Sequence, residues 1–180
     1  FSLGLNGLGS CATQYSSEYF DAEIIRDGFR YTLHFEKGEN IGGLHKEPTR
    51  QKQTGSRQRW KPDLEVFTDI AIPVDYFRDT LKKQAVVNKG LQFLLRIEQE
   101  DGSFVEETFC YENGITDYVK EITGEQSLTA VQYWETEQRG RDREDKDEYK
   151  VKLSVAFCFS NRVKFLEYYH NSSHLEYGGS

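Results

Sequence analysis

The sequence lacks methionine altogether and has only three cysteines and three prolines among its 180 residues. A complete translation product that keeps its start residue contains methionine, so we expect this chain to be a segment of a longer protein. Cys11, Cys110 and Cys158 lie far apart, without a metal-binding spacing and in an odd number. We interpret them as small buried hydrophobic residues of a protein from a reducing compartment.

Long apolar runs are also missing, since none approaches the roughly 18 residues that a membrane span needs. The first residues do not have the basic and apolar regions of a signal peptide. We therefore expect a cytoplasmic protein with no membrane partner. Four histidines are present, and only His170 and His174 have an i,i+4 spacing, in a segment without a helical pattern, so we expect no metal site.

What the chain does have is enough apolar and aromatic content, 37% and 14%, to bury a core. In its first part, Phe29 to Phe35 alternate with polar residues, which predicts a half-buried strand. Asp27-Gly28 separates this strand from an apolar run over residues 19–25, which predicts a hairpin. Residues 10–17 favour a short helix, and residues 38–53, with their glycines and a proline, favour a mobile loop.

A second section begins near residue 70. Helical periodicity predicts one helix capped by Asp75 and closed by Gly90, and another capped by Asn113. Alternation predicts strands over residues 91–97, 104–111, 128–135 and 149–159. The charged run 135–150, with a net charge of -2, suits a solvated hairpin tip. The order indicates two α/β modules, a fragment of mixed sheet followed by a β-α-β-β-α-β-β section.

The chain opens on a glycine pattern, residues 4–9, that leads into the predicted short helix. Glycine lets the backbone turn with positive φ and approach a ligand closely, and a helix amino end adds partial positive charge. Such a loop can hold a phosphate, although a tight turn before a helix would give the same pattern. No strand precedes the loop in this chain, so it does not fit the dinucleotide fingerprint.

Three stretches, GLNGLGS, QTGSRQRWKPDLEVFTD and LKKQAVVNKGLQFLLR, occur in this order and together resemble a known family. They are similar to the ATPase subunit of bacterial type II topoisomerases, the gyrase B and topoisomerase IV B family, over nearly the whole chain. The resemblance implies an α+β fold in two parts. Residues 1–70 would be the C-terminal part of a GHKL-type ATPase α/β sandwich. Residues 71–180 would be a transducer domain with a left-handed βαβ crossover, incomplete at its C-terminal end.

The resemblance also implies site residues. Ser56, in the Thr54-Gly55-Ser56 match to a Thr-Gly-Thr strand, would bind near the adenine end of ATP. The family's catalytic glutamate and magnesium-binding asparagine would lie before residue 1, so no catalytic residue or metal ligand is expected in this segment. A histidine is usual where this chain has Asn6, and the backbone amides there would still be available. The ATP-phosphate-binding residues would be Gly4, Leu5, Asn6, Gly7, Leu8 and Gly9.

By the same resemblance, the parent protein would be an ATP-hydrolysing DNA topoisomerase with ATP and Mg²⁺ as cofactors. Its partners would be the topoisomerase A subunit, DNA and a second copy of the ATPase subunit, with which it dimerises on binding ATP. This segment alone would be inactive. An alternative is a non-catalytic interaction or dimerisation module derived from a split GHKL ATPase. A mismatch-repair or chaperone relative is a third reading, and the block at residues 81–92 favours the topoisomerase over it. Gyrase and topoisomerase IV are not distinguished.

A basic run is the last feature. Residues 45–61 contain a single acid, Glu47. A solvated loop and strand edge would account for this composition, and a weak contact with the phosphate backbone of DNA is the functional hypothesis. The basic side chains of the run are Lys46, Arg50, Lys52, Arg57, Arg59 and Lys61.

Overall fold

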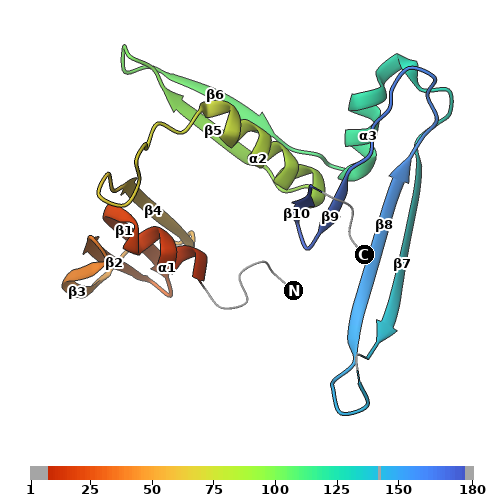
Figure 1. Ribbon diagram of the computed structural model, residues 1–180. Helices are drawn as coiled ribbons and strands as arrows, with labels where there is room; N and C mark the ends of the chain where they lie inside the picture. The colour runs from red at the N-terminus through yellow and green to blue at the C-terminus, as the bar shows by residue number, and fades with distance from the viewer. Residues whose placement is uncertain (1–7, 142, 177–180) are drawn as a thin grey trace. The chain divides into compact units, whose positions relative to one another are not determined.

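The computed structural model describes residues 8–141 and 143–176 (Figure 1). Its residues up to Ile72 form one compact unit, and those from Pro73 onward form a second. The division falls close to the boundary expected near residue 70. Within the described residues, no helix is long and apolar enough to cross a membrane.

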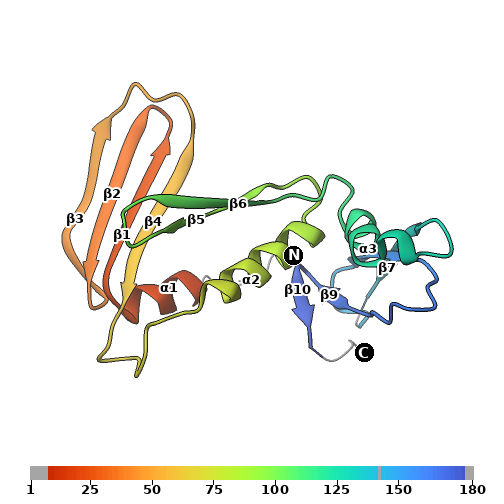
Figure 2. The ribbon, with the colours of Figure 1, turned by 90° about the horizontal axis from the view of Figure 1, so that it is seen from above.

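The first unit is a four-stranded sheet with one short helix, α1 (Leu8–Tyr15), at its start. The strand order is β3-β2-β1-β4, and every neighbouring pair is antiparallel (Figure 2). The expected mixed sheet is therefore wrong: two hairpins join β1, β2 and β3, and β4 reaches the far edge by a crossing and pairs antiparallel with β1. The strands are β1 (Ser17–Arg26), β2 (Phe29–Glu36), β3 (Glu39–Pro48) and β4 (Gly55–Pro62).

Two tight turns set the register of this sheet. Asp27 and Gly28 join β1 to β2 with φ of 54° and 78°, and Lys37 and Gly38 join β2 to β3 with φ of 48° and 84°. Two central residues with positive φ are the requirement of the turn whose twist matches a hairpin. The side chain of Gln14 in α1 donates to the Gly38 carbonyl at 2.9 Å, so the second turn also holds the helix.

Strand β3 occupies residues 39–48 of the mobile loop that we expected over residues 38–53, and residues 49–53 form neither helix nor strand. Every residue of β3 is exposed, so the strand has no alternation of buried and exposed side chains to reveal it. Gly42 and Gly43 have φ of 82° and 75° and lie at a bulge, where the pairing with β2 shifts between Thr32 and His34. Glycine at a bulge bends an edge strand without ending its pairing.

The second unit consists of helices and two-stranded antiparallel hairpins. No strand forms at residues 67–70, where the expected β-α-β-β-α-β-β order begins, and the last hairpin was not expected. The left-handed βαβ crossover stays a prediction, because each strand pair within the described residues is antiparallel. The elements are α2 (Val74–Val87), β5 (Phe93–Glu98), β6 (Phe104–Phe109), α3 (Ile115–Thr123), a 3₁₀ turn (Gly124–Gln126), β7 (Gln132–Gly140), β8 (Tyr149–Phe157), β9 (Tyr168–His170) and β10 (Ser173–Leu175).

The core of this unit lies where α2 and α3 meet the β5–β6 hairpin. Ala85 and Val86 of α2 and Tyr111, which follows β6, are buried there, with Phe93 and Tyr118 packed against them. Apolar residues that recur along one side of α2 bring these side chains to the hairpin. This small cluster is the one buried hydrophobic cluster found among the described residues of the unit.

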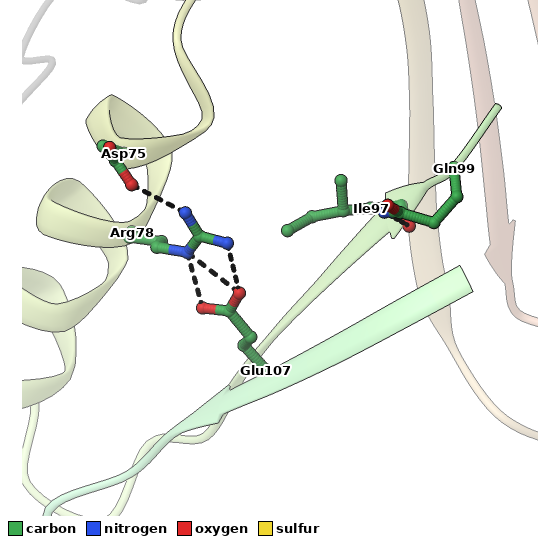
Figure 3. Close-up of polar contacts among 5 residues, drawn as sticks. All are labelled: Asp75, Arg78, Ile97, Gln99 and Glu107. Carbon is green, nitrogen blue, oxygen red and sulfur yellow. Dashed lines mark hydrogen bonds and ion pairs between the residues drawn. The ribbon is translucent and has the colours of Figure 1, made fainter. Parts of the chain in front are cut away.

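The helix caps differ from those expected. Pro73 takes the cap position of α2, and Asp75 lies in the first turn, where its carboxylate accepts from Arg78 at 2.6 Å. Arg78 also binds the Glu107 carboxylate through two nitrogens, at 2.6 to 2.9 Å (Figure 3). Gly114 with φ of 57° takes the cap position of α3, and Asn113 instead donates from its backbone to Asp117 at 2.7 Å. Neither Asp75 nor Asn113 caps a helix, because each carboxylate or amide is engaged by a side chain of its own segment.

The β7–β8 hairpin extends into the charged run: β7 ends at Gly140 and β8 begins at Tyr149, so the tip is shorter than the expected 135–150. Its apolar face carries Trp134 and Val155, which are exposed, while Glu137 pairs with Lys150 at 2.8 Å on the other face. The interpretation of the cysteines as buried residues is wrong. Cys11 is exposed on α1, whereas Cys110 and Cys158 are half-buried, and all three are free thiols.

Candidate functional site

The start of α1 is the described part of the glycine loop. Gly4, Leu5, Asn6 and Gly7 lie outside the described residues, while Leu8 and Gly9 begin the helix. A β-carbon added at Gly9 would meet no atom within 4 Å. Within the described chain, Gly9 is therefore required neither for packing nor for a positive φ.

Side-chain hydrogen bonds close the carboxyl end of α1, and its first turn is free of acidic side chains. At the carboxyl end, the hydroxyl of Ser16 donates to the Ala12 carbonyl at 2.7 Å, and that of Ser17 to the Thr13 carbonyl at 2.5 Å. The first N–H groups of a helix have no intrahelical acceptor and carry partial positive charge. The first turn of α1 contains no acidic side chain. This arrangement suits an anion at Leu8 and Gly9.

Ser56 lies near the start of β4, opposite Ile24 of β1. Because directly paired residues and every second residue share a sheet face, Ser56 is on the same face as Ile24 and Trp60. Those two side chains are 42% and 48% exposed, and Ser56 is exposed as well. A hydroxyl beside open apolar surface can bind the polar edge of a flat heteroaromatic ring.

The structure does not join Ser56 to the start of α1. Ser17, which follows α1, pairs with Pro62 at the far end of β4, whereas Ser56 pairs with Ile24. The seven strand positions between Ser17 and Ile24 correspond to roughly 23 Å. Among the described residues, no hydrogen bond connects Ser56 with Leu8 or Gly9.

The opposite, polar face of the sheet holds a shallow groove of about 340 Å³. Within it, His34 Nδ1 lies 2.6 Å from Asp21 Oδ1, and Nε2 lies 3.4 Å from Glu36 Oε1. The hydrogen bond with Asp21, followed by that with Glu36, raises the pKa of His34. Sequence reasoning missed this pair. The two-residue turn at Asp27-Gly28 was the signal for it, since that turn places Asp21 opposite His34.

The described residues contain no group of three or more histidine, cysteine, aspartate or glutamate side chains that could hold a metal ion. His170 and His174 lie on β9 and β10. His174 Nε2 is 3.8 Å from Glu167 and its ring packs edge-on against Tyr169, so it acts as part of the hairpin packing. The catalytic base and the magnesium ligand, expected before residue 1, stay predictions.

No family model matches the chain. It is similar to the DNA gyrase B protein of Synechocystis, with 27% identity over 187 residues, which covers 97% of this chain and 16% of that protein. It is also similar to the DNA topoisomerase 4 B protein of Enterococcus faecalis, with 29% identity over 91% of this chain and 24% of that protein. The chain thus spans a quarter or less of the length of these two relatives.

A solved structure shares the fold. The 43K ATPase domain of Thermus thermophilus gyrase B, crystallised with an aminocoumarin, superposes with a TM-score of 0.66 and 24% sequence identity. The match covers 89% of this chain and 41% of that one. Both described units therefore contribute to an α+β fold that resembles the gyrase B ATPase region.

Proposed function

Because the chain is homologous to the gyrase B and topoisomerase IV B proteins across most of its length, we propose that it couples ATP binding and hydrolysis to DNA strand passage as part of such a subunit. The observation that carries the proposal is that the similarity runs through both compact units and does not stop at one of them. A lone nucleotide-binding module would need the first unit only.

In this proposal, residues 1–70 complete the ATPase domain and residues 71–180 belong to the transducer. The amides of residues 4–9 hold the phosphates of ATP, and Ser56 binds near the adenine end. The lack of an acidic side chain in the first turn of α1 and the exposed apolar face beside Ser56 support these roles. The base that orients water and the ligand of Mg²⁺ would come from other parts of the parent subunit.

The proposed coupling requires partners. ATP binding would bring two copies of the ATPase subunit together, and a topoisomerase A subunit would cut and rejoin the DNA. The relatives are named as subunits of gyrase and topoisomerase 4, which supports such an assembly. Ligand-driven dimerisation of this kind stores binding energy in a closed state that hydrolysis releases.

Replacing Gly9 with alanine in the complete subunit tests the phosphate-binding role. A β-carbon there meets no atom of the described residues, so Gly9→Ala should leave α1 as stable as before, or more stable by up to about 1 kcal/mol. If a phosphate lies against this position, ATP affinity and ATP-dependent relaxation of supercoiled DNA should both fall at least tenfold. The measurements are nucleotide titration, plasmid relaxation with the topoisomerase A subunit, and thermal melting.

The control is Ala12→Gly, at an exposed position of the same helix. It should lower the stability of α1 while ATP binding stays at the wild-type level. Wild-type affinity in Gly9→Ala would refute the phosphate role. ATP binding without turnover or relaxation by the wild-type subunit would instead favour the non-catalytic interaction module.

A further inference from the structure

The connection from β3 to β4 crosses one end of the sheet. These two strands are the outer strands of the four, so residues 49–54 must pass over the turn between β1 and β2. The backbone N–H of Thr49 donates to the Gly28 carbonyl at 2.8 Å, which fixes the crossing at this turn. We call residues 49–57, from the crossing to the start of β4, the basic strap.

Ion pairs around the strap leave its cations free. Glu47 and Glu23 both pair with Arg30, at 3.3 and 3.6 Å, and Asp27 pairs with Arg26 at 3.1 Å. The neighbouring acids are thus already bound by other side chains. Among the described residues, the strap cations form no ion pair, and each is exposed. They are Arg50, Lys52 and Arg57.

Free cations are confined to one run within the described part of the first unit. Four other basic side chains of the first unit each form an ion pair: Arg26, Arg30, Lys37 and Lys61. Of the two unpaired cations outside the strap, Lys46 covers the Phe29 ring at 4.0 Å, and Arg59 lies 5.6 Å from the Tyr19 ring. Arg57 and Arg59 line the groove on the polar face, where Asp21 is bound to His34.

A polyanion with regularly spaced charges fits this surface better than a single small anion does. Arg50 and Lys52 lie in the irregular crossing and Arg57 lies in β4, so the three cations are separated along the chain and each can reach a different phosphate. Residues 73–180 carry 14 basic and 20 acidic side chains, so the net charge of the second unit is negative.

We propose that the basic strap binds the phosphate backbone of duplex DNA through Arg50, Lys52 and Arg57. The inference rests on the proposed function, because it identifies the surface by which that subunit touches its DNA. The contact is with phosphates alone, so it carries no sequence preference. Its strength should depend on salt, since each neutralised phosphate releases counterions.

The test is DNA binding by the complete subunit, measured as fluorescence anisotropy of a labelled duplex of about 30 base pairs over a range of KCl concentrations. Replacing Arg50, Lys52 and Arg57 by serine should reduce the slope of log affinity against log salt by about 2 to 3, because each lost phosphate contact removes roughly 0.9. The matched control replaces Lys89, Arg162 and Lys164, which are exposed and form no ion pair within the described part of the second unit. The control carries the same change in charge and should keep the wild-type slope.

An unchanged slope in the strap variant, or an equal loss in the control, would overturn the proposal. So would tighter binding of polyglutamate than of the duplex at matched charge, which would point to an acidic protein partner. Thermal melting of both variants checks that each is still folded. A strap variant with lysine rather than serine at position 57 keeps one positive charge and should recover part of the lost salt slope. Plasmid relaxation by the wild type separates the DNA-binding role of the strap from the proposed function. If the salt slope depends on the strap but the wild type shows no ATP-dependent relaxation, the strap binds DNA and the proposed function is wrong.

Discussion

Each of the two units of this chain is stabilised internally by a different kind of interaction. In the first, one continuous sheet joins four strands, and backbone hydrogen bonds link each strand to the next. In the second, separate two-stranded hairpins depend on helices α2 and α3 and on side chains between them. Two-stranded hairpins are marginal on their own in water. The second unit should therefore be the more sensitive to single side-chain changes, and the first to changes at its turns.

The largest expected effect is at Val86, which is 1% exposed in the core of the second unit. Val86→Asp would bury an unpaired charge and should cost about 3 to 5 kcal/mol, enough to unfold that unit. Hydrogen exchange measured by mass spectrometry should then show lost protection in α2 and β5, with β1 and β2 still protected. The control Val151→Asp, at a position that is 50% exposed, should change little. Equal loss in β1 and β2 would show that the units unfold together.

In the first unit, the two tight turns offer a matched pair of substitutions. Gly28 and Gly38 both have positive φ, but a β-carbon at Gly28 meets open space, while one at Gly38 runs into the ring of Tyr15. Gly28→Ala should cost about 1 kcal/mol from backbone conformation, and Gly38→Ala a further amount of about 1 to 3 kcal/mol from the clash. Urea unfolding measures both values.

Tyr15→Ala provides the test of that explanation. In this background the extra cost of Gly38→Ala over Gly28→Ala should disappear, because the ring that the β-carbon meets is gone. If the difference persists, the clash does not explain it, and the second turn must be limited by backbone conformation alone.

Much of the fold of the two units could be predicted from the sequence, and each prediction that failed did so for a physical reason. The β1–β2 hairpin and α2 followed from alternation, periodicity and the Asp27-Gly28 turn. Strand β3 was missed because an edge strand with only exposed side chains is defined by backbone pairing, which composition does not record. Both predicted caps were wrong, since Asp75 and Asn113 instead bind side chains three and four residues further along the chain, and composition does not show which of these local contacts forms.

The candidate site was predictable to a smaller extent. The glycine pattern marked the start of α1, and the resemblance placed Ser56 on a strand, as found. The pairing of Asp21 with His34 needed only the register set by a two-residue turn. By contrast, the free state of Arg50, Lys52 and Arg57 could not be inferred, because it depends on Arg30 binding both Glu23 and Glu47 from neighbouring strands.

A smaller effect, dependent on pH, is expected where Arg78 joins α2 to β6 in the second unit (Figure 3). The hydrogen bonds from Arg78 lower the pKa of Glu107 below its ordinary value of 4.5. A carboxylate with a lowered pKa in the folded state stabilises the fold above its unfolded pKa and loses that contribution as pH falls through the folded pKa. The melting temperature of the wild type should therefore fall more steeply below about pH 4.5 than that of Glu107→Gln.

The control for this prediction is Glu100→Gln, which removes the same charge from the β5–β6 hairpin without touching Arg78. Its melting temperature should follow the wild-type curve in acid. Parallel curves for the wild type and Glu107→Gln would mean that Arg78 does not hold the hairpin to α2 through this carboxylate.

The smallest effect is expected on the charged face of the β7–β8 hairpin. Glu137 and Lys150 are paired at 2.8 Å, but their side chains are 51% and 60% exposed. Exposed pairs of this kind gain little because water screens them and two long side chains must be held in place. Glu137→Gln should change the free energy of unfolding by no more than about 0.5 kcal/mol, and about 0.5 M KCl should remove even that difference. A loss in the free energy of unfolding well above about 1 kcal/mol that persists in salt would show that cross-strand charges hold this hairpin together. Side chains rather than backbone pairing would then stabilise even the most exposed strands of the second unit.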